Sequence, residues 1–152
     1  MAKRLYSQIG ICMVFLFVLA PSFCKSQNNQ SPTNLVSGQW QSAMLRSDGK
    51  VVLNGVEAYC TKSNCNGTEY VFIKFVNTNN YQVKLEWVDG IYFNGVWNYS
   101  QNPNPKQFVI AAGATAEGTC NGDIKLKVTV NSLVNDPSPN KHFSVTGLKV
   151  TQ

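Results

Sequence analysis

Residues 69–88, EYVFIKFVNTNNYQVKLEWV, contain two apolar runs on either side of an asparagine-rich turn at 77–80. In the second run, apolar positions alternate with polar ones: Tyr81, Val83, Leu85 and Trp87. A period of two is typical of a β-strand with one buried face. The first run, residues 70–76, is apolar except at Lys74 and indicates a more central strand. We predict that the two runs pair as a β-hairpin in the middle of the core.

Further short strands are predicted after residue 40, separated by turn residues. They are expected at 40–46, 51–53, 56–61, 107–112, 123–130 and 143–150, with a bulge at Gly147. In 123–130 the inward residues are expected to be Ile124, Leu126, Val128 and Val130. Residues 61–68 are expected to be a loop, 113–122 a turn-rich connection, and Asp89-Gly90 the end of the hairpin. The sequence therefore predicts an all-β, antiparallel β-sandwich of seven or eight strands.

The first 22 residues have the three parts of a secretory signal peptide. Lys3 and Arg4 form a basic start, residues 9–20 form an apolar run, and small residues follow. At about 1.5 Å per residue the run covers only about 18 Å of a bilayer core of about 30 Å, so no membrane span is expected after its removal. Cleavage is expected after residue 22, or as late as residue 26. Residues 23–39 are predicted to be a flexible leader and 40–152 the folded domain.

The charge of the chain is low and evenly spread. The formal net charge is +5, and it falls to +2 if the mature chain starts at Gln27, because ten lysines and arginines then face eight acidic residues. No basic cluster could follow a phosphate backbone, so nucleic acid is not an expected partner. The export signal instead predicts a protein that is secreted, periplasmic or held at the cell surface.

Three cysteines lie in the predicted domain: Cys60, Cys65 and Cys120. Export to an oxidising compartment favours a disulfide. Either Cys60 pairs with Cys65, or one of them pairs with Cys120 and closes a loop of about 55 to 60 residues, for which the chain-entropy model gives about 4 kcal/mol. These cysteines and His142 match no metal-site spacing. We predict no metal site and no cofactor, and expect His142 to be an exposed loop histidine.

No arrangement of residues points to catalysis. The chain has one histidine, no Gly-x-Ser-x-Gly elbow and eight scattered acidic residues. Glu69 and Glu86 could lie on paired strands, but both face solvent in the predicted alternation, where Lys74 or Lys84 is an ordinary partner. We therefore expect a protein that is not an enzyme.

The candidate binding surface is the aromatic segment that follows the predicted hairpin. Its candidate ligand-binding residues are Tyr92, Trp97, Asn98 and Tyr99. Flat aromatic faces beside amide groups suit a sugar, which has an apolar face and a rim of hydroxyls. The alternative is structural: Tyr92 or Phe93, together with Trp97, packs onto the sandwich as a further hairpin around Asn94-Gly95. We favour this alternative for at least half of the aromatic side chains, because an open patch of four would promote aggregation.

The order of strands, cysteines and core tryptophan from residue 50 to 151 resembles an immunoglobulin-like sandwich. Two segments, KFVNTNNYQVKLEW and IAAGATAEGTC, are also similar to small secreted bacterial proteins of unknown function with this type of fold. The resemblance implies export. One departure is Gly118, which stands two residues before Cys120, where antibody domains have the tyrosine of the tyrosine corner.

Together these features predict a secreted, non-catalytic β-sandwich that acts by binding or as a surface or structural component. The alternative is a carbohydrate-binding module that uses the aromatic segment 91–99. A small secreted enzyme or inhibitor is a third class. The expected partner is an extracellular glycan or protein.

Overall fold

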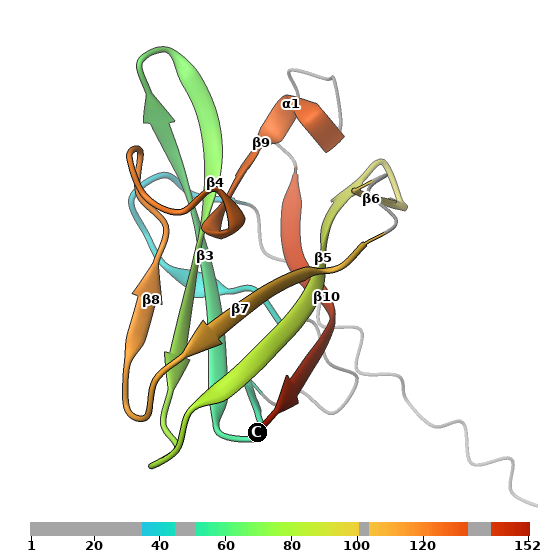
Figure 1. The fold of residues 1–152 in the computed structure, drawn as a ribbon. Helices are drawn as coiled ribbons and strands as arrows, with labels where there is room; N and C mark the ends of the chain where they lie inside the picture. Colours follow the sequence, from blue (N-terminus) through green and yellow to red (C-terminus); the bar gives the residue numbers. More distant parts are fainter. Residues whose placement is uncertain (1–34, 45–50, 101–103, 134–140) are drawn as a thin grey trace, which may run out of the picture.

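The computed structural model describes residues 35–44, 51–100, 104–133 and 141–152. In these residues two antiparallel sheets, one of six strands and one of four, face each other as a β-sandwich (Figure 1). The helical elements described are short: a 3-10 turn at Ile124–Leu126 and one helical turn, α1, at Val130–Leu133. The predicted fold class, all-β with an antiparallel β-sandwich, is confirmed.

The six-stranded sheet contains β1 (Gln41–Ser42), β2 (Val52–Leu53), β3 (Val56–Cys65), β4 (Thr68–Asn77), β8 (Thr115–Glu117) and β9 (Lys127–Thr129). Its order is β1-β3-β4-β8, and β2 also pairs with β3 while β9 also pairs with β4. The four-stranded sheet contains β5 (Val83–Phe93), β6 (Val96–Tyr99), β7 (Lys106–Ile110) and β10 (His142–Thr151). In it, β5 is central, with β10 on one side and β6 and β7 along the other. The strands described exceed the predicted number because the aromatic segment forms β6 and the connection 113–122 contains β8.

The buried faces of the two sheets meet in one hydrophobic core. Val83, Leu85 and Trp87 are fully buried, and the Trp87 ring packs edge-on against Phe75 with ring centroids 4.9 Å apart. The predicted alternation and the burial of Trp87 are thus confirmed. Tyr81, predicted to share this face, is 39% exposed because it lies ahead of the first residue of β5. The central position predicted for residues 70–76 is also confirmed, since β4 pairs with β3 on one side and with β8 and β9 on the other.

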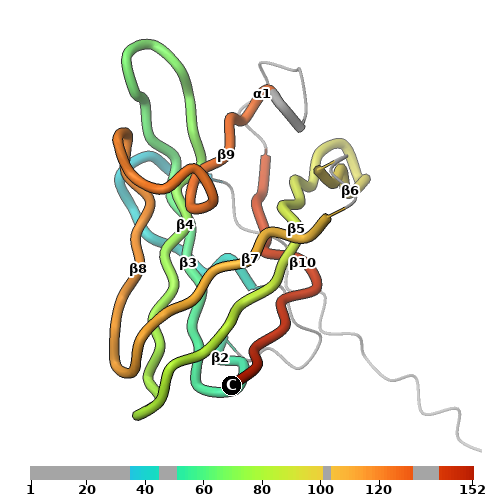
Figure 2. Tube along the Cα trace, viewed as in Figure 1, coloured from blue at the N-terminus to red at the C-terminus, as the bar shows by residue number. Residues whose placement is uncertain are grey.

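The predicted hairpin between the two runs is wrong, because β4 and β5 belong to different sheets. Figure 2 shows the chain leaving the end of β4 and turning into β5, which runs away from β4 in the second sheet. The hairpin partner of β4 is β3, and the two-residue turn between them is Asn66-Gly67, both with positive φ. Asn-Gly is the preferred pair for such a turn. Residues 61–68, predicted as a loop, are therefore the end of this hairpin.

The corner between the sheets is held by Asn77, the last residue of β4. Its buried side-chain Nδ2 donates hydrogen bonds to the carbonyl oxygens of Tyr81 and Ala111, both at 2.9 Å. Its Oδ1 accepts from the backbone N–H of Asn79 at 3.1 Å. Where the chain turns between two sheets, these backbone groups have no ladder partner. The asparagine side chain therefore supplies the hydrogen bonds that a paired strand would supply.

Replacing Asn77 with aspartate is expected to lower the free energy of unfolding by about 1–3 kcal/mol or more. Aspartate has nearly the same shape, but its second oxygen cannot donate and would face the carbonyl oxygens of Tyr81 and Ala111. Chemical denaturation measures the change. Asn80→Asp, at an exposed position of the same turn, is the matched control and should change stability by less than about 0.5 kcal/mol. Equal losses in the two variants would contradict the role given to Asn77.

Two other predicted segments differ from the structure. Asp89-Gly90 does not end the strand, since β5 continues to Phe93 and Asp89 is buried. Residues 124–126 form a 3-10 turn instead of a strand, because the Asp123 side chain accepts a hydrogen bond from the N–H of Lys125 and stabilises the turn. Ile124, predicted to face inward, is 76% exposed as a result.

Three other residues predicted to face the core do so. Leu126 and Val130 are buried, and Val128 packs against the core. The bulge in the last strand is also confirmed: the register of β10 on β5 shifts between Thr146 and Lys149, and Gly147 has a φ of 63°.

Residues 35–39, the end of the predicted leader, contact the sandwich. Leu35 is part of the core cluster, and its N–H donates to the carbonyl oxygen of Lys141 at 3.0 Å. Ser37 forms a parallel bridge with Lys62 of β3. The signal peptide, both expected cleavage sites and the turn near Asp48-Gly49 lie outside the described residues.

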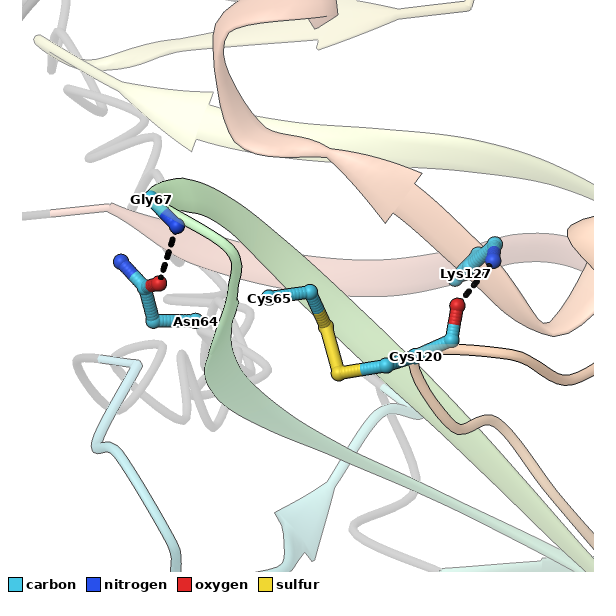
Figure 3. Close-up of a disulfide and its surroundings, with 5 residues drawn as sticks. All are labelled: Asn64, Cys65, Gly67, Cys120 and Lys127. Atoms are coloured by element: carbon cyan, nitrogen blue, oxygen red, sulfur yellow. Dashed lines mark hydrogen bonds between the residues drawn. A yellow bond between two sulfur atoms is a disulfide. The ribbon is translucent and has the colours of Figure 1, made fainter.

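A disulfide joins Cys65 to Cys120, so the long-range alternative is confirmed and the Cys60–Cys65 pairing is not formed. It connects the end of β3 to the segment after β8 (Figure 3). Both ends belong to the six-stranded sheet region, whereas the antibody-type disulfide joins the two sheets. A side chain at buried Gly118 would meet the carbonyl oxygen of Leu126, which leaves no room for a tyrosine corner there. Cys60 is a free thiol in the core, and burial raises its pKa to about 12.

Candidate functional site

The strand register brings several aromatic side chains to the outer face of the four-stranded sheet. Tyr92 of β5 lies opposite Trp97 of β6, and Gly90 lies opposite Tyr99. Residues directly opposite in an antiparallel pair share a face, and neighbours along a strand point to opposite faces. Because Ile91 is fully buried toward the other sheet, Tyr92, Trp97 and Tyr99 lie on the outer face.

His142 extends this group across the sheet. It is the first residue of β10 and lies opposite Tyr92, on the side of β5 away from β6. We call the four side chains Tyr99, Trp97, Tyr92 and His142 the aromatic row. The expectation that His142 is a loop histidine is wrong. No local sequence signal places it beside Tyr92, because the two residues are far apart in the chain and only the β5–β10 pairing joins them.

Neighbouring rings of the aromatic row are in contact. Their centroids are 6.3 Å apart between Tyr99 and Trp97, 5.4 Å between Trp97 and Tyr92, and 5.9 Å between Tyr92 and His142. The planes of Tyr99 and Trp97 differ by only 13°. Tyr99 is 48% exposed, and the other three side chains are partly exposed. The row thus presents aromatic surface to solvent from a regular sheet.

Gly90 allows the rings to lie close to the backbone. A Cβ atom at this position would lie 3.3 Å from ring atoms of both Trp97 and Tyr99 and 2.7 Å from Oγ1 of Thr146. Such distances are shorter than ordinary contacts between carbon atoms. The absence of a side chain at Gly90 is therefore a condition for the observed positions of the two rings.

The structure separates the fourth candidate residue from the other three. Asn98 lies opposite Ile91 and so is on the other face of β6, where its Nδ2 donates to the carbonyl oxygen of Val96 at 3.3 Å. Phe93 also packs toward the core. The further hairpin around Asn94-Gly95 is formed, with both turn residues at positive φ. Sequence reasoning identified the hairpin, and the alternation of side chains along β6 was the signal that could have separated Asn98 from Trp97 and Tyr99.

The outer face of the four-stranded sheet differs between its two ends. At the far end from the aromatic row it carries the Lys84–Glu86 ion pair at 3.1 Å, with Gln107 donating to Glu86 at 2.9 Å. At the aromatic end, the other positions that the register assigns to this face are uncharged: Val88, Gly90, Ser144 and Thr146. The site is therefore apolar and hydroxyl-bearing.

The two acidic residues considered for catalysis, Glu69 and Glu86, lie in different sheets. Glu69 is in the six-stranded sheet and pairs with Lys62 at 2.6 Å, whereas Glu86 is in the other sheet and pairs with Lys84, the partner expected for it. The buried carboxylate of Asp89 forms an ion pair with Lys106, whose Nζ lies 2.7 Å from Oδ2. Across the described ranges, no group of three or more His, Cys, Asp or Glu side chains could hold a metal ion.

Comparisons with known proteins give no relative for this chain. No protein-family model, curated protein or solved structure matches it. Among the residues that the structure describes, no helix has the length and apolar character needed to cross a membrane.

Proposed function

We propose that this protein is a secreted, non-catalytic binding module that holds a carbohydrate on the aromatic row. The observation that carries the proposal is the placement of Trp97, Tyr99 and Tyr92 side by side on the outer face of a regular sheet. Aromatic planes can stack on the apolar face of a sugar ring. Thr146 lies on the same face and is partly exposed, so its hydroxyl can bond a sugar hydroxyl, whereas the hydroxyl of buried Ser144 donates to the carbonyl oxygen of Ala43 at 2.9 Å.

Secretion is part of the proposal. It is supported by the signal-peptide pattern of residues 1–22 and agrees with the disulfide Cys65–Cys120, because such bonds persist in oxidising compartments. Non-catalytic action is supported by the ion-paired states of Glu69, Glu86 and Asp89.

Trp97→Ala is expected to weaken glycan binding by about tenfold or more, because a tryptophan at the centre of a binding site is the type of residue whose truncation costs about 2 kcal/mol or more. The measurement is binding of the wild type and variant to a glycan array, followed by calorimetric titration with the glycans that bind. Tyr81→Ala is the control, since Tyr81 is an exposed aromatic residue outside the row. It should bind as the wild type does.

Gly90→Ala provides a second variant that retains every ring. The added methyl group would displace Trp97 and Tyr99, so binding should fall although no aromatic side chain is removed. Thermal unfolding checks that both variants remain folded. If the wild type binds no glycan, or if Trp97→Ala binds as well as the wild type, the proposal is wrong.

A further inference from the structure

The aromatic row has a shape that bears on the length of the ligand. From Trp97 through Tyr92 to His142 it runs across three adjacent strands, β6, β5 and β10, with ring-to-ring steps of 5.4 and 5.9 Å. Adjacent strands are about 4.8 Å apart, so this direction is set by the sheet itself. Each step is close to the length of one sugar unit in an extended chain. A single sugar would leave much of the row without a contact.

The surroundings of the row bear on the charge of the ligand. The register gives this end of the outer face no lysine, arginine, aspartate or glutamate among the described residues, and the Lys84–Glu86 pair lies at the other end. An acidic glycan would need cations to offset the loss of hydration of its carboxylates. An uncharged glycan has no such requirement.

From these two observations we infer that the aromatic row binds an uncharged glycan chain across three consecutive sugar units, with His142 as the contact at the β10 end. This inference rests on the proposed function and adds the length and charge of the ligand to it. His142 contributes its partly exposed ring, which lies beside Tyr92, whereas its Nδ1 is buried and has no hydrogen-bond partner among the described residues.

The test is calorimetric titration of the whole mature protein with β-1,4-linked glucose and N-acetylglucosamine oligosaccharides of one to six units. The Kd of the wild type is expected to fall by roughly tenfold or more from one unit to three and to change little beyond that. Uronic acid oligosaccharides of the same lengths are the charged comparison and should bind at least about tenfold more weakly.

His142→Ala should weaken binding of the three-unit ligand by several-fold and leave binding of the single sugar unchanged. His142→Phe should restore binding, because it keeps a flat aromatic ring in place of the imidazole, whose Nδ1 has no hydrogen-bond partner among the described residues. Both variants are checked by thermal unfolding.

The failure of this inference is distinguishable from failure of the proposed function. Equal Kd values for one and six units, or full binding of long oligosaccharides by His142→Ala, would overturn the chain-length inference and leave a glycan site. Tighter binding of the uronic acid series would overturn the uncharged ligand. No binding of any sugar would overturn the proposed function itself.

Discussion

Replacing Lys106 with methionine is expected to lower the free energy of unfolding by about 3–5 kcal/mol, the usual cost of leaving a buried charge without its partner. The Lys106 Nζ lies 2.7 Å from Oδ2 of Asp89, whose side chain is only 2% exposed. Methionine fills a similar volume but leaves the carboxylate in the core without its cation. Urea denaturation of the two proteins measures the difference.

The size of this effect follows from what the lysine connects. Besides Asp89 on β5, its Nζ donates to the carbonyl oxygens of Lys125 at 2.9 Å and Lys127 at 3.2 Å. These two carbonyls belong to the 3-10 turn and to β9 of the opposite sheet. The other oxygen of Asp89 accepts from Nε1 of the buried Trp87 at 2.9 Å. One ammonium group thus joins the two sheets beside the largest core side chain.

Two further variants separate the charge effect from other causes. Lys84→Met removes a lysine from the exposed Lys84–Glu86 pair and should cost less than about 1 kcal/mol. The double variant Lys106→Met with Asp89→Asn removes both charges and should lose less stability than Lys106→Met alone, since no unpaired carboxylate remains. Similar losses for Lys106→Met and Lys84→Met would show that the buried pair has no special role.

Removing the disulfide by Cys65→Ala with Cys120→Ala is expected to cost about 4 kcal/mol in the chain-entropy model. The two cysteines are 55 residues apart, and the loop they close contains five strands, β4 to β8. Without the bond, the unfolded chain regains the freedom of that whole segment, while the native contacts remain. Denaturation of the oxidised protein and of the double variant measures the loss.

The matched control for the disulfide is Cys60→Ala, which removes the buried cysteine that forms no bond. Cys60→Ala should lower the free energy of unfolding by less than the double variant does, because it removes one buried sulfur atom and leaves the loop closed. Alkylation of the denatured, unreduced protein followed by peptide mapping should label Cys60 and leave Cys65 and Cys120 unlabelled. Labelling of all three residues would contradict the bond.

Part of the candidate site could be predicted from sequence, and part could not. Tyr92, Trp97 and Tyr99 stand out because aromatic residues beside an Asn-Gly turn predict a hairpin, and the spacing of two between Trp97 and Tyr99 puts them on one face. Asn98 could be separated from them by the same alternation. His142 could not be found in this way, because its contact with Tyr92 depends on the pairing of strands about fifty residues apart.

Some features of the fold likewise depend on local sequence, and others depend on long-range contacts. From sequence alone follow the all-β class, the buried face of Val83, Leu85 and Trp87 and the bulge at Gly147, because alternation and turn conformation are properties of a few neighbouring residues. Sequence left three disulfide pairings open and misassigned the partner of β4. The alternation of apolar and polar residues indicates which face of a strand is buried, but it does not indicate which strand pairs with it.

Tertiary structure decided the remaining points. The runs within 69–88 became strands of opposite sheets because Asn77 satisfies the backbone groups at the corner, and because β4 pairs along its length with β3 while β5 pairs with β10. Asp89, a turn residue by its local sequence, continues β5 because Lys106 and Trp87 satisfy its carboxylate in the core. In both cases a hydrogen-bonding partner distant in the chain outweighs the local preference, since an unpaired polar group in the core costs more than a turn propensity contributes.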